Sequence, residues 1–227
     1  MKRLFFIIIF LALLPVIYLL FIPDISTLKK ENPRRTALME YREKEWKENG
    51  KKLKIKQIWI PLAKVSPFLI KAVIIAEDDK FWKHEGFDYD TLEKAIEKDI
   101  EAMKFKLGAS TITQQLAKNL YLSPAKNPLR KIAEAIITWR MEKALRILEL
   151  YLNVIEWGNG IYGIEAASRH YYGKPSSRLT PQEAVRLAAI MPNPRKYNPI
   201  GTQRFVARRA NLIYKIMTRR GIVVPEY

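Results

Sequence analysis

The chain has 227 residues, with Lys+Arg 40 against Asp+Glu 23, a formal net charge of +17 and no cysteine. This length allows one ordinary domain plus an extra segment, and the missing cysteine excludes a disulfide scaffold, a cysteine zinc site and a thiol nucleophile. The positive charge favours an anionic partner, which could be nucleic acid, an anionic lipid or a phosphorylated substrate.

An uncharged, strongly apolar run occupies residues 4–22 (LFFIIIFLALLPVIYLLFI), directly after two basic residues. As a helix it would span roughly 28 Å, about the thickness of one bilayer core. A cleaved secretory signal would have a shorter apolar run and a cleavage site of small residues, which the sequence IPD at its end does not offer. We therefore predict a cytoplasmic N-terminus at residues 1–3 and an uncleaved transmembrane signal-anchor at residues 4–22.

Residues 23–56 are polar and strongly charged, and we predict a juxtamembrane linker there. Within it, Thr36 begins a stretch suited to a helix, which Asn49-Gly50 would end. Residues 57–60 (QIWI) could form a lone strand. We expect residues 57–227 to be one mainly α-helical domain, because apolar residues recur there at intervals of three and four. The helix start signals are Ser66-Pro67, Asp90 with Glu93, Asn127-Pro128 and Thr180-Pro181.

A first group of chemically active side chains lies in residues 77–88 (EDDKFWKHEGFD), after an apolar run that is typical of a buried helix. If that helix continued, Glu77, Phe81 and His84 would share one face. A carboxylate beside apolar groups loses hydration, so its pKa rises and it becomes a better proton acceptor near neutral pH. The simpler alternative is a charged helix end with solvated acids.

A second group lies in residues 108–119 (GASTITQQLAKN). Small and hydroxyl residues that open a helix leave backbone N–H groups free, and such a helix start favours an anionic ligand. Thr111, Gln115 and Lys118 would then lie on one face and present a hydroxyl, an amide and a cation. The alternative is an ordinary capped helix with a polar surface.

A third group lies in residues 130–134 (RKIAE), where Arg130 and Glu134 are one helical turn apart. A surface ion pair is the simple interpretation. The alternative is a second site carboxylate beside two cations, suited to holding a metal-bound pyrophosphate.

Residues 158–163 (GNGIYG) match the GxGxxG pattern of dinucleotide sites. Such a site needs a strand before the glycines, whereas residues 146–153 have a helical pattern. We therefore assign these glycines to tight turns. The two histidines, His84 and His170, form no two-histidine metal motif.

Taken together, these segments resemble the five signature motifs of the peptidoglycan glycosyltransferases, which polymerise cell-wall precursors. The first three are the groups described above; the fourth is residues 146–174, with the phrase VIEWG, and the fifth is residues 179–199. The ending HEGFD and the phrase VIEWG look most like the monofunctional biosynthetic transglycosylases. That resemblance implies a lysozyme-like helical fold, and a single-pass anchor in a bacterial inner membrane with the catalytic domain on the periplasmic side.

The resemblance also implies roles for particular residues. Glu77 matches the catalytic base and Glu134 the second glutamate, with a contact to a pyrophosphate-bound metal. The remaining matches are substrate-binding positions: Asp78, Phe81, His84, Ser110, Thr111, Gln114, Gln115, Lys118, Asn119, Arg130 and Lys131.

The implied substrates are lipid II, as acceptor, and the lipid-linked growing glycan strand, as donor. A divalent cation, Mg²⁺ or Mn²⁺, is expected to act with the pyrophosphate, with no organic cofactor. The membrane and other cell-wall synthesis or division proteins are the expected partners. We expect no nucleic-acid partner, because an anchor restricts where the domain can go.

Two alternatives remain open. A lysozyme-like lytic enzyme would share the helical fold and one catalytic glutamate, although it would have no use for cations that bind a pyrophosphate. An inactive, membrane-anchored scaffold for wall synthesis is the other, because residues 89–107 and 142–149 are shorter than in many family members.

Overall fold

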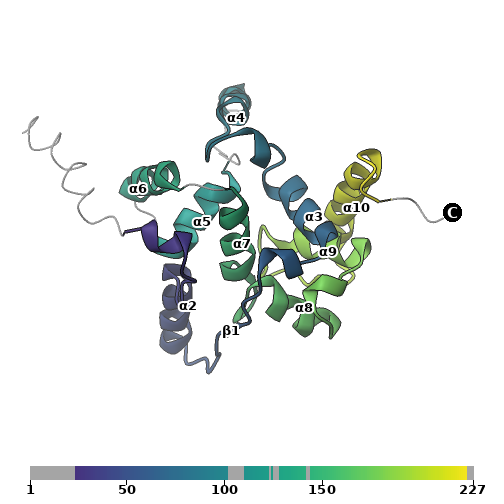
Figure 1. The fold of residues 1–227 in the computed structure, drawn as a ribbon. Helices are drawn as coiled ribbons and strands as arrows, with labels where there is room; N and C mark the ends of the chain where they lie inside the picture. Colours follow the sequence, from purple (N-terminus) through teal and green to yellow (C-terminus); the bar gives the residue numbers. More distant parts are fainter. Residues whose placement is uncertain (1–23, 102–109, 123, 125–127, 142–143, 224–227) are drawn as a thin grey trace, which may run out of the picture.

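A computed structural model of the chain describes residues 24–101, 110–122, 124, 128–141 and 144–223. Within these residues the protein is mainly helical, with one small sheet (Figure 1). The α-helices are α2 (Ala37–Glu48), α3 (Pro67–Glu77), α4 (Tyr89–Glu101), α5 (Ile112–Tyr121), α6 (Pro128–Arg140), α7 (Ala144–Val154), α8 (Ile164–Tyr172), α9 (Pro181–Ile190) and α10 (Arg204–Arg219). The 3₁₀ helices are η1 (Ser26–Lys29), η2 (Leu62–Lys64), η3 (Phe81–Lys83) and η4 (Ser176–Arg178), and the strands are β1 (Lys56–Gln57), β2 (Glu156–Gly158) and β3 (Ile161–Tyr162).

Two groups of helices form the body of the molecule. On one side α3 packs against α9 and α10, and on the other α5 packs against α2, α6 and α7 (Figure 1). Buried side chains of both groups, among them Leu69, Leu116, Leu148 and Leu187, belong to one continuous core. α4 stands apart from this body at the top of Figure 1.

Two helices begin where the sequence predicts. Thr36 accepts the N–H of Met39 at 3.2 Å and opens α2, which ends at Glu48 before Asn49. Thr180 opens α9 in a capping box with Glu183. Both predictions are confirmed because a threonine hydroxyl satisfies an amide that the first helical turn leaves unpaired.

Two other start signals were wrong in detail. Ser66 precedes α3, but its hydroxyl donates to the Leu179 carbonyl at 3.0 Å instead of capping the helix. Asp88, and not Asp90, accepts the N–H of Thr91 at 3.0 Å at the start of α4. The Asn127 signal lies outside the described residues, although α6 does begin at Pro128.

The lone strand predicted at residues 57–60 was also wrong. β1 pairs in parallel with β3, which pairs antiparallel with β2, in a sheet of order β1-β3-β2. A Cβ atom at Gly160 would lie 2.7 Å from the Lys54 carbonyl oxygen, and Gly160 has φ +76°. Only glycine fits there, as the turn interpretation requires. The short strand β2 ends at Gly158, the first of these glycines, but the chain then turns into β3, whereas a dinucleotide site leads from its strand into a helix.

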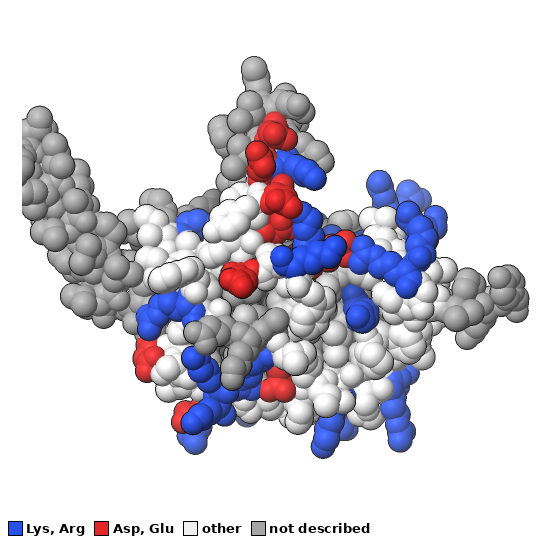
Figure 2. All heavy atoms as spheres, turned by 45° about the horizontal axis from the view of Figure 1, so that its top comes forward, with Lys and Arg blue, Asp and Glu red and all other residues white. Residues whose placement is uncertain are grey.

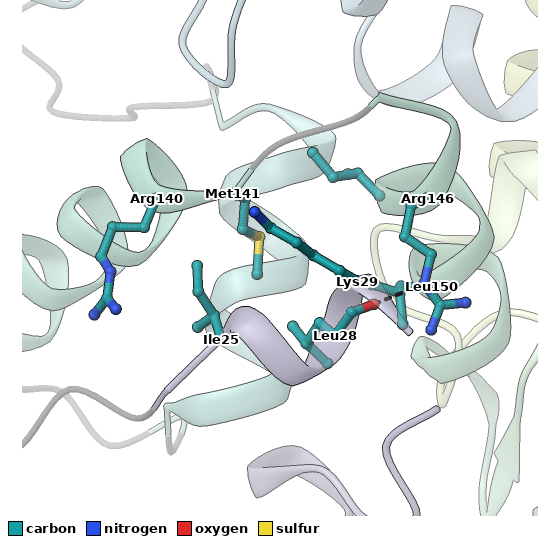
Figure 3. Close-up of a pocket in the computed structure, with 8 residues that line it drawn as sticks. Ile25, Leu28, Lys29, Arg140, Met141, Arg146 and Leu150 are labelled. Atoms are coloured by element: carbon teal, nitrogen blue, oxygen red, sulfur yellow. Dashed lines mark hydrogen bonds between the residues drawn. The ribbon is translucent and has the colours of Figure 1, made fainter. Parts of the chain in front are cut away.

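The N-terminal part of the described chain is held to α7 by Arg146. Its guanidinium donates to the Leu28 carbonyl oxygen at 2.7 Å (Figure 3). It also donates to the Glu31 carbonyl oxygen at 2.7 Å. Ile25 and Leu28 of this segment line a cavity of about 30 Å³ together with Leu150. Among the described residues no helix is long and apolar enough to cross a membrane. The predicted N-terminus at residues 1–3 and anchor at residues 4–22 lie outside the described residues.

Candidate active site

The end of α3 positions Glu77. The last helical hydrogen bond of α3 runs from the Asp78 N–H to the Ile74 carbonyl at 2.9 Å, and the helix ends at Glu77. Glu77, Phe81 and His84 therefore do not share one helix face. The Glu77 side chain is only 12% exposed. Burial raises the pKa of Glu77, although a bond from Gln115 and the charge of Arg209 act in the opposite direction. The alternative of a solvated carboxylate at this position is thereby excluded.

Each oxygen of Glu77 has one partner. Gln115 of α5 donates to Oε2 at 3.0 Å, and Arg209 of α10 donates to Oε1 at 3.0 Å. Arg209 also donates to the Ala76 carbonyl at 3.0 Å. The carboxylate is therefore held by side chains from two helices, α5 and α10, and these side chains follow Glu77 in the sequence by 38 and 132 positions.

The sequence interpretation did not include Arg209. A signal for it exists, because Val206, Ala210, Ile213 and Met217 form the buried stripe of α10. Arg209 is three residues after Val206 and four before Ile213, so a helix projection places it on the same face. An arginine on a buried face requires an acidic or carbonyl partner.

Tyr151 of α7 determines how Gln115 is oriented. The Tyr151 hydroxyl donates to Gln115 Oε1 at 2.9 Å, so the amide must direct its NH₂ group toward Glu77. Tyr151 is fully buried, and burial holds the pKa of its hydroxyl well above the ordinary value. Tyr151 is therefore a neutral donor at all physiological pH values.

Asp78 and His84 support the start of α5. Asp78 Oδ2 accepts the N–H of Ile112 at 3.0 Å, and Oδ1 is 2.8 Å from His84 Nε2. His84 Nδ1 accepts the N–H of Gly86 at 3.2 Å, so the ring carries its proton on Nε2 and donates to Asp78. Phe81 is buried beside this pair, with its ring at right angles to His84.

Three amides of the helix start at residues 110–114 are bonded within the protein, where the sequence predicts free ones. The N–H of Thr111 donates to Gln114 Oε1 at 2.9 Å, and the N–H of Gln114 donates to Thr111 Oγ1 at 3.2 Å. The N–H of Ile112 is taken by Asp78. Thr111 and Gln114 thus form a capping box, and the expected anionic ligand at this helix start stays a prediction.

Glu134 is buried between two cations. It is only 2% exposed, and it pairs with Arg130 at 3.3 Å and with Lys131. Lys131 Nζ also lies 3.5 Å from the Ser110 hydroxyl. The interpretation of Arg130 and Glu134 as a surface ion pair is excluded by this burial.

Lys118 interacts electrostatically with both glutamates. Burial lowers the pKa of Lys118, the charges of Arg130 and Lys131 lower it further, and Glu134 and Glu77 act against them. Within the described part of the chain its ammonium group makes no direct ion pair. Asn119 is half-buried on α5, and no hydrogen bond joins it to this cluster among the described residues.

Glu77 opens onto a hollow of about 310 Å³, which Ser110 and Thr111 also line. The other acids on its wall have partners: Asp78 accepts the N–H of Ile112, Asp88 pairs with Lys80, and Asp79 pairs with Arg220 at 2.6 Å. Figure 2 shows acidic and basic side chains side by side on this face of the molecule. Glu77 is thus the buried carboxylate of this hollow with a raised pKa.

The described residues do not fit a metal held by protein ligands alone. They contain no group of three or more His, Asp or Glu side chains that could hold an ion. Both oxygens of Glu134 are taken by Arg130 and Lys131.

Comparison with known proteins identifies the family. A family model described as "Transglycosylase" matches residues 45–218, most of the chain. The chain belongs to the transglycosylase family. It is 45% identical over 194 residues to the biosynthetic peptidoglycan transglycosylase of Nitrosospira multiformis, covering 84% of each chain. The protein of that name from Azoarcus sp. (strain BH72) is 49% identical over 172 residues (74% of each chain), and that of Janthinobacterium sp. (strain Marseille) is 44% identical over 225 residues (97% of each).

Proposed function

We propose that this transglycosylase polymerises the glycan strands of peptidoglycan, the synthesis that the names of its relatives state for those proteins. The observation that carries the proposal is the state of Glu77. It is a buried carboxylate with a raised pKa, oriented by Gln115 and Arg209 and open to a hollow. These are the properties of a general base that works near neutral pH.

In the proposed reaction Glu77 accepts the proton of the 4-hydroxyl of the acceptor, lipid II. That oxygen attacks C1 of the donor, the lipid-linked growing strand, and a new C–O bond forms. The bond from C1 to the pyrophosphate oxygen breaks with inversion from α to β, and undecaprenyl pyrophosphate leaves with the bonding electrons. A held carboxylate accelerates such a step by about 10²–10⁴-fold.

Lys118, Arg130 and Lys131 are proposed to neutralise the charge of the leaving pyrophosphate. Glu134 pairs with two of these cations and so positions them. Lys118 has no direct ion pair among the described residues, which leaves its ammonium group available for the phosphate oxygens. A glycosidase needs a strong acid for its leaving group, and this cluster of cations suits a pyrophosphate better.

We propose that a divalent cation reaches the site bound to the substrate. Because the described residues do not fit a resident metal, a Mg²⁺ or Mn²⁺ ion would have to arrive with the pyrophosphate and would help to neutralise its charge. The other predicted substrate contacts, Ser110, Thr111, Gln114 and Asn119, also stay predictions.

The proposed setting is the cell envelope, where peptidoglycan is made. We propose a lysozyme-like arrangement of the helices and a single membrane span at residues 4–22, with the catalytic domain on the periplasmic side of the inner membrane. The mainly helical fold and the uncharged N-terminal run support this arrangement. Other wall-synthesis or division proteins are proposed partners in that setting.

The test is polymerisation of lipid II by the full chain in detergent, with Mg²⁺ present. Glu77→Gln should reduce polymer formation by about 10³-fold, because a neutral amide cannot accept the proton. The matched control is Glu85→Gln, since Glu85 is an exposed acid of the same motif. It should polymerise at the wild-type rate, and both variants should keep the wild-type melting temperature.

Three results would overturn the proposal. Wild-type activity in Glu77→Gln would remove Glu77 as the base. Release of soluble fragments from purified cell walls, without polymerisation, would favour the lytic enzyme. A folded wild-type chain that does neither would favour the inactive scaffold.

A further inference from the structure

A second hollow, of about 540 Å³, lies beside β1, at the end of the molecule opposite α4 (Figure 1). Lys52, Lys54 and Lys56 line one wall, and Lys196 lies on the wall that follows α9. No Asp or Glu is among the residues that line it, and it shares none of them with the hollow at Glu77. The proposed polymerase chemistry makes no use of this hollow.

The charge in this hollow is not compensated. Lys52, Lys54, Lys56 and Lys196 are exposed, and within the described part of the chain none of them forms an ion pair. Arg195 differs, because it is engaged by Glu45 at 2.9 Å. Clustered lysines without acids nearby produce a positive potential that attracts an anionic ligand.

The lysines occupy alternate positions of the chain that runs into β1. Ile55 packs against the cluster around Trp46, and Gln57 donates to the Asn153 carbonyl at 2.7 Å. Lys54 and Lys56, the residues before and after Ile55, are exposed. The alternation begins at Lys54, because Leu53 is also exposed and lines the hollow. This alternation repeats roughly every 6.7 Å, twice the rise per residue of a strand. An extended peptide repeats its side chains at the same interval.

Two further features suit a peptide. In the order β1-β3-β2, β1 is an edge strand among the described residues, and an edge strand can pair with an extended chain. Tyr171 and Tyr197 also line the hollow and provide apolar surface between the charges. Lipid headgroups have no fixed repeat that would match the lysines.

We propose that this hollow binds an extended acidic segment of a partner protein, whose alternate carboxylates meet Lys54 and Lys56 while Lys52 and Lys196 add positive charge. The match of spacing and charge carries the inference. It does not depend on the proposed polymerase function, because binding is measured directly.

The probe is a short fluorescent peptide of alternating Glu and Thr, and its control is a peptide of the same composition with the glutamates in one block. Binding to the full chain in detergent is followed by fluorescence anisotropy at moderate salt. The alternating peptide should bind at least about tenfold more tightly than the block peptide, because only its carboxylates match the lysine repeat.

The variant combines Lys52→Glu, Lys54→Glu and Lys56→Glu. It should bind the alternating peptide at least about tenfold more weakly than the wild type does. The control makes the same charge change at Lys64, Lys71 and Lys215, which are exposed outside the hollow. Its affinity for the alternating peptide should stay within about twofold of the wild-type affinity. A triple Lys→Gln variant at residues 52, 54 and 56 guards against misfolding; it should also bind more weakly, at the wild-type melting temperature.

The inference is overturned if both peptides bind equally, since that would be charge attraction without register. It is also overturned if the control variant loses as much affinity as the hollow variant. Binding of phosphatidylglycerol vesicles through the same lysines, without binding of the alternating peptide, would assign the hollow to a membrane surface instead.

Discussion

At the scale of single residues, two opposed effects act on the pKa of Glu77, the candidate base. Burial raises the pKa of Glu77, while Gln115 and Arg209 stabilise its ionised form. The raised pKa keeps the carboxylate a competent proton acceptor, and the two partners keep it ionised and oriented. Removing a partner should therefore change the pH dependence of the rate as well as its size.

Arg209→Met tests this balance. A base works when it is ionised, and loss of a nearby cation makes ionisation less favourable, so the pKa of Glu77 rises further. The acidic limb of the kcat/KM profile should move to higher pH by about one unit. Arg208→Met is the matched control, because Arg208 is the exposed neighbour on α10. An unshifted profile in Arg209→Met would mean that the arginine serves packing alone.

Tyr151→Phe tests the orientation of Gln115. Without the hydroxyl, the amide of Gln115 can turn its oxygen toward Glu77 and lose the bond to it. We expect kcat to fall about tenfold with little change in KM. The control is Tyr162→Phe: the Tyr162 hydroxyl is buried without a partner among the described residues, so its removal should leave the rate unchanged. Equal effects of both variants would contradict the role of Tyr151.

At the scale of elements, the helix starts differ in where their caps come from. α9 is capped by its own Thr180, whereas α5 has its own Thr111 and also the carboxylate of Asp78, which follows α3. This second cap ties the helix that carries Gln115 and Lys118 to the helix end that carries Glu77. Local signals predict the first kind of cap only.

Asp78→Ala and Thr180→Ala compare these two kinds of cap. Thr180→Ala should lower the free energy of unfolding by about 1 kcal/mol. Asp78→Ala should lower it by about 2–3 kcal/mol, because it leaves the buried N–H of Ile112 and the ring of His84 without their acceptor. Urea unfolding measures both values. A loss in Asp78→Ala no larger than in Thr180→Ala would mean that water or another group replaces the carboxylate.

At the scale of the whole molecule, contacts between distant segments join the site to the ends of the described chain. Arg146 and Leu28 are 118 residues apart, and Arg209 and Glu77 are 132 apart. The first contact holds the N-terminal segment to α7, the helix of Tyr151. The second brings the last helix of the described chain to the candidate base.

Arg146→Lys should release the segment at residues 26–32. A lysine cannot reproduce the planar fork that reaches the Leu28 and Glu31 carbonyls together. Hydrogen exchange of the backbone amides in this segment should speed up by about tenfold or more, with the core amides unchanged. Arg169→Lys is the control, because Arg169 is an exposed arginine that pairs with Glu165 on its own helix. Unchanged exchange in Arg146→Lys would show that apolar contacts of Ile25 and Leu28 suffice.

The sequence by itself determined those features of the protein that depend on residues close together in the chain. It identified the mainly helical fold, the caps at Thr36 and Thr180, the turn at Gly160 and the motifs that resemble those of the family. These signals are local: a hydroxyl caps an amide two or three residues away, and apolar residues at intervals of three and four define one helix face. The expected burial of Glu77 is of the same kind, because an apolar helix precedes it directly.

Only the tertiary structure decided which distant groups meet. The Arg209 contact to Glu77, the Asp78 cap on α5 and the sheet that joins β1 to β3 all link segments separated by 34 to 132 residues or by intervening helices. The same local pattern is compatible with several partners: the Ser66 hydroxyl donates to the Leu179 carbonyl and does not cap its own helix. Which partner is chosen depends on how the two groups of helices pack, because packing alone brings these side chains within bonding distance.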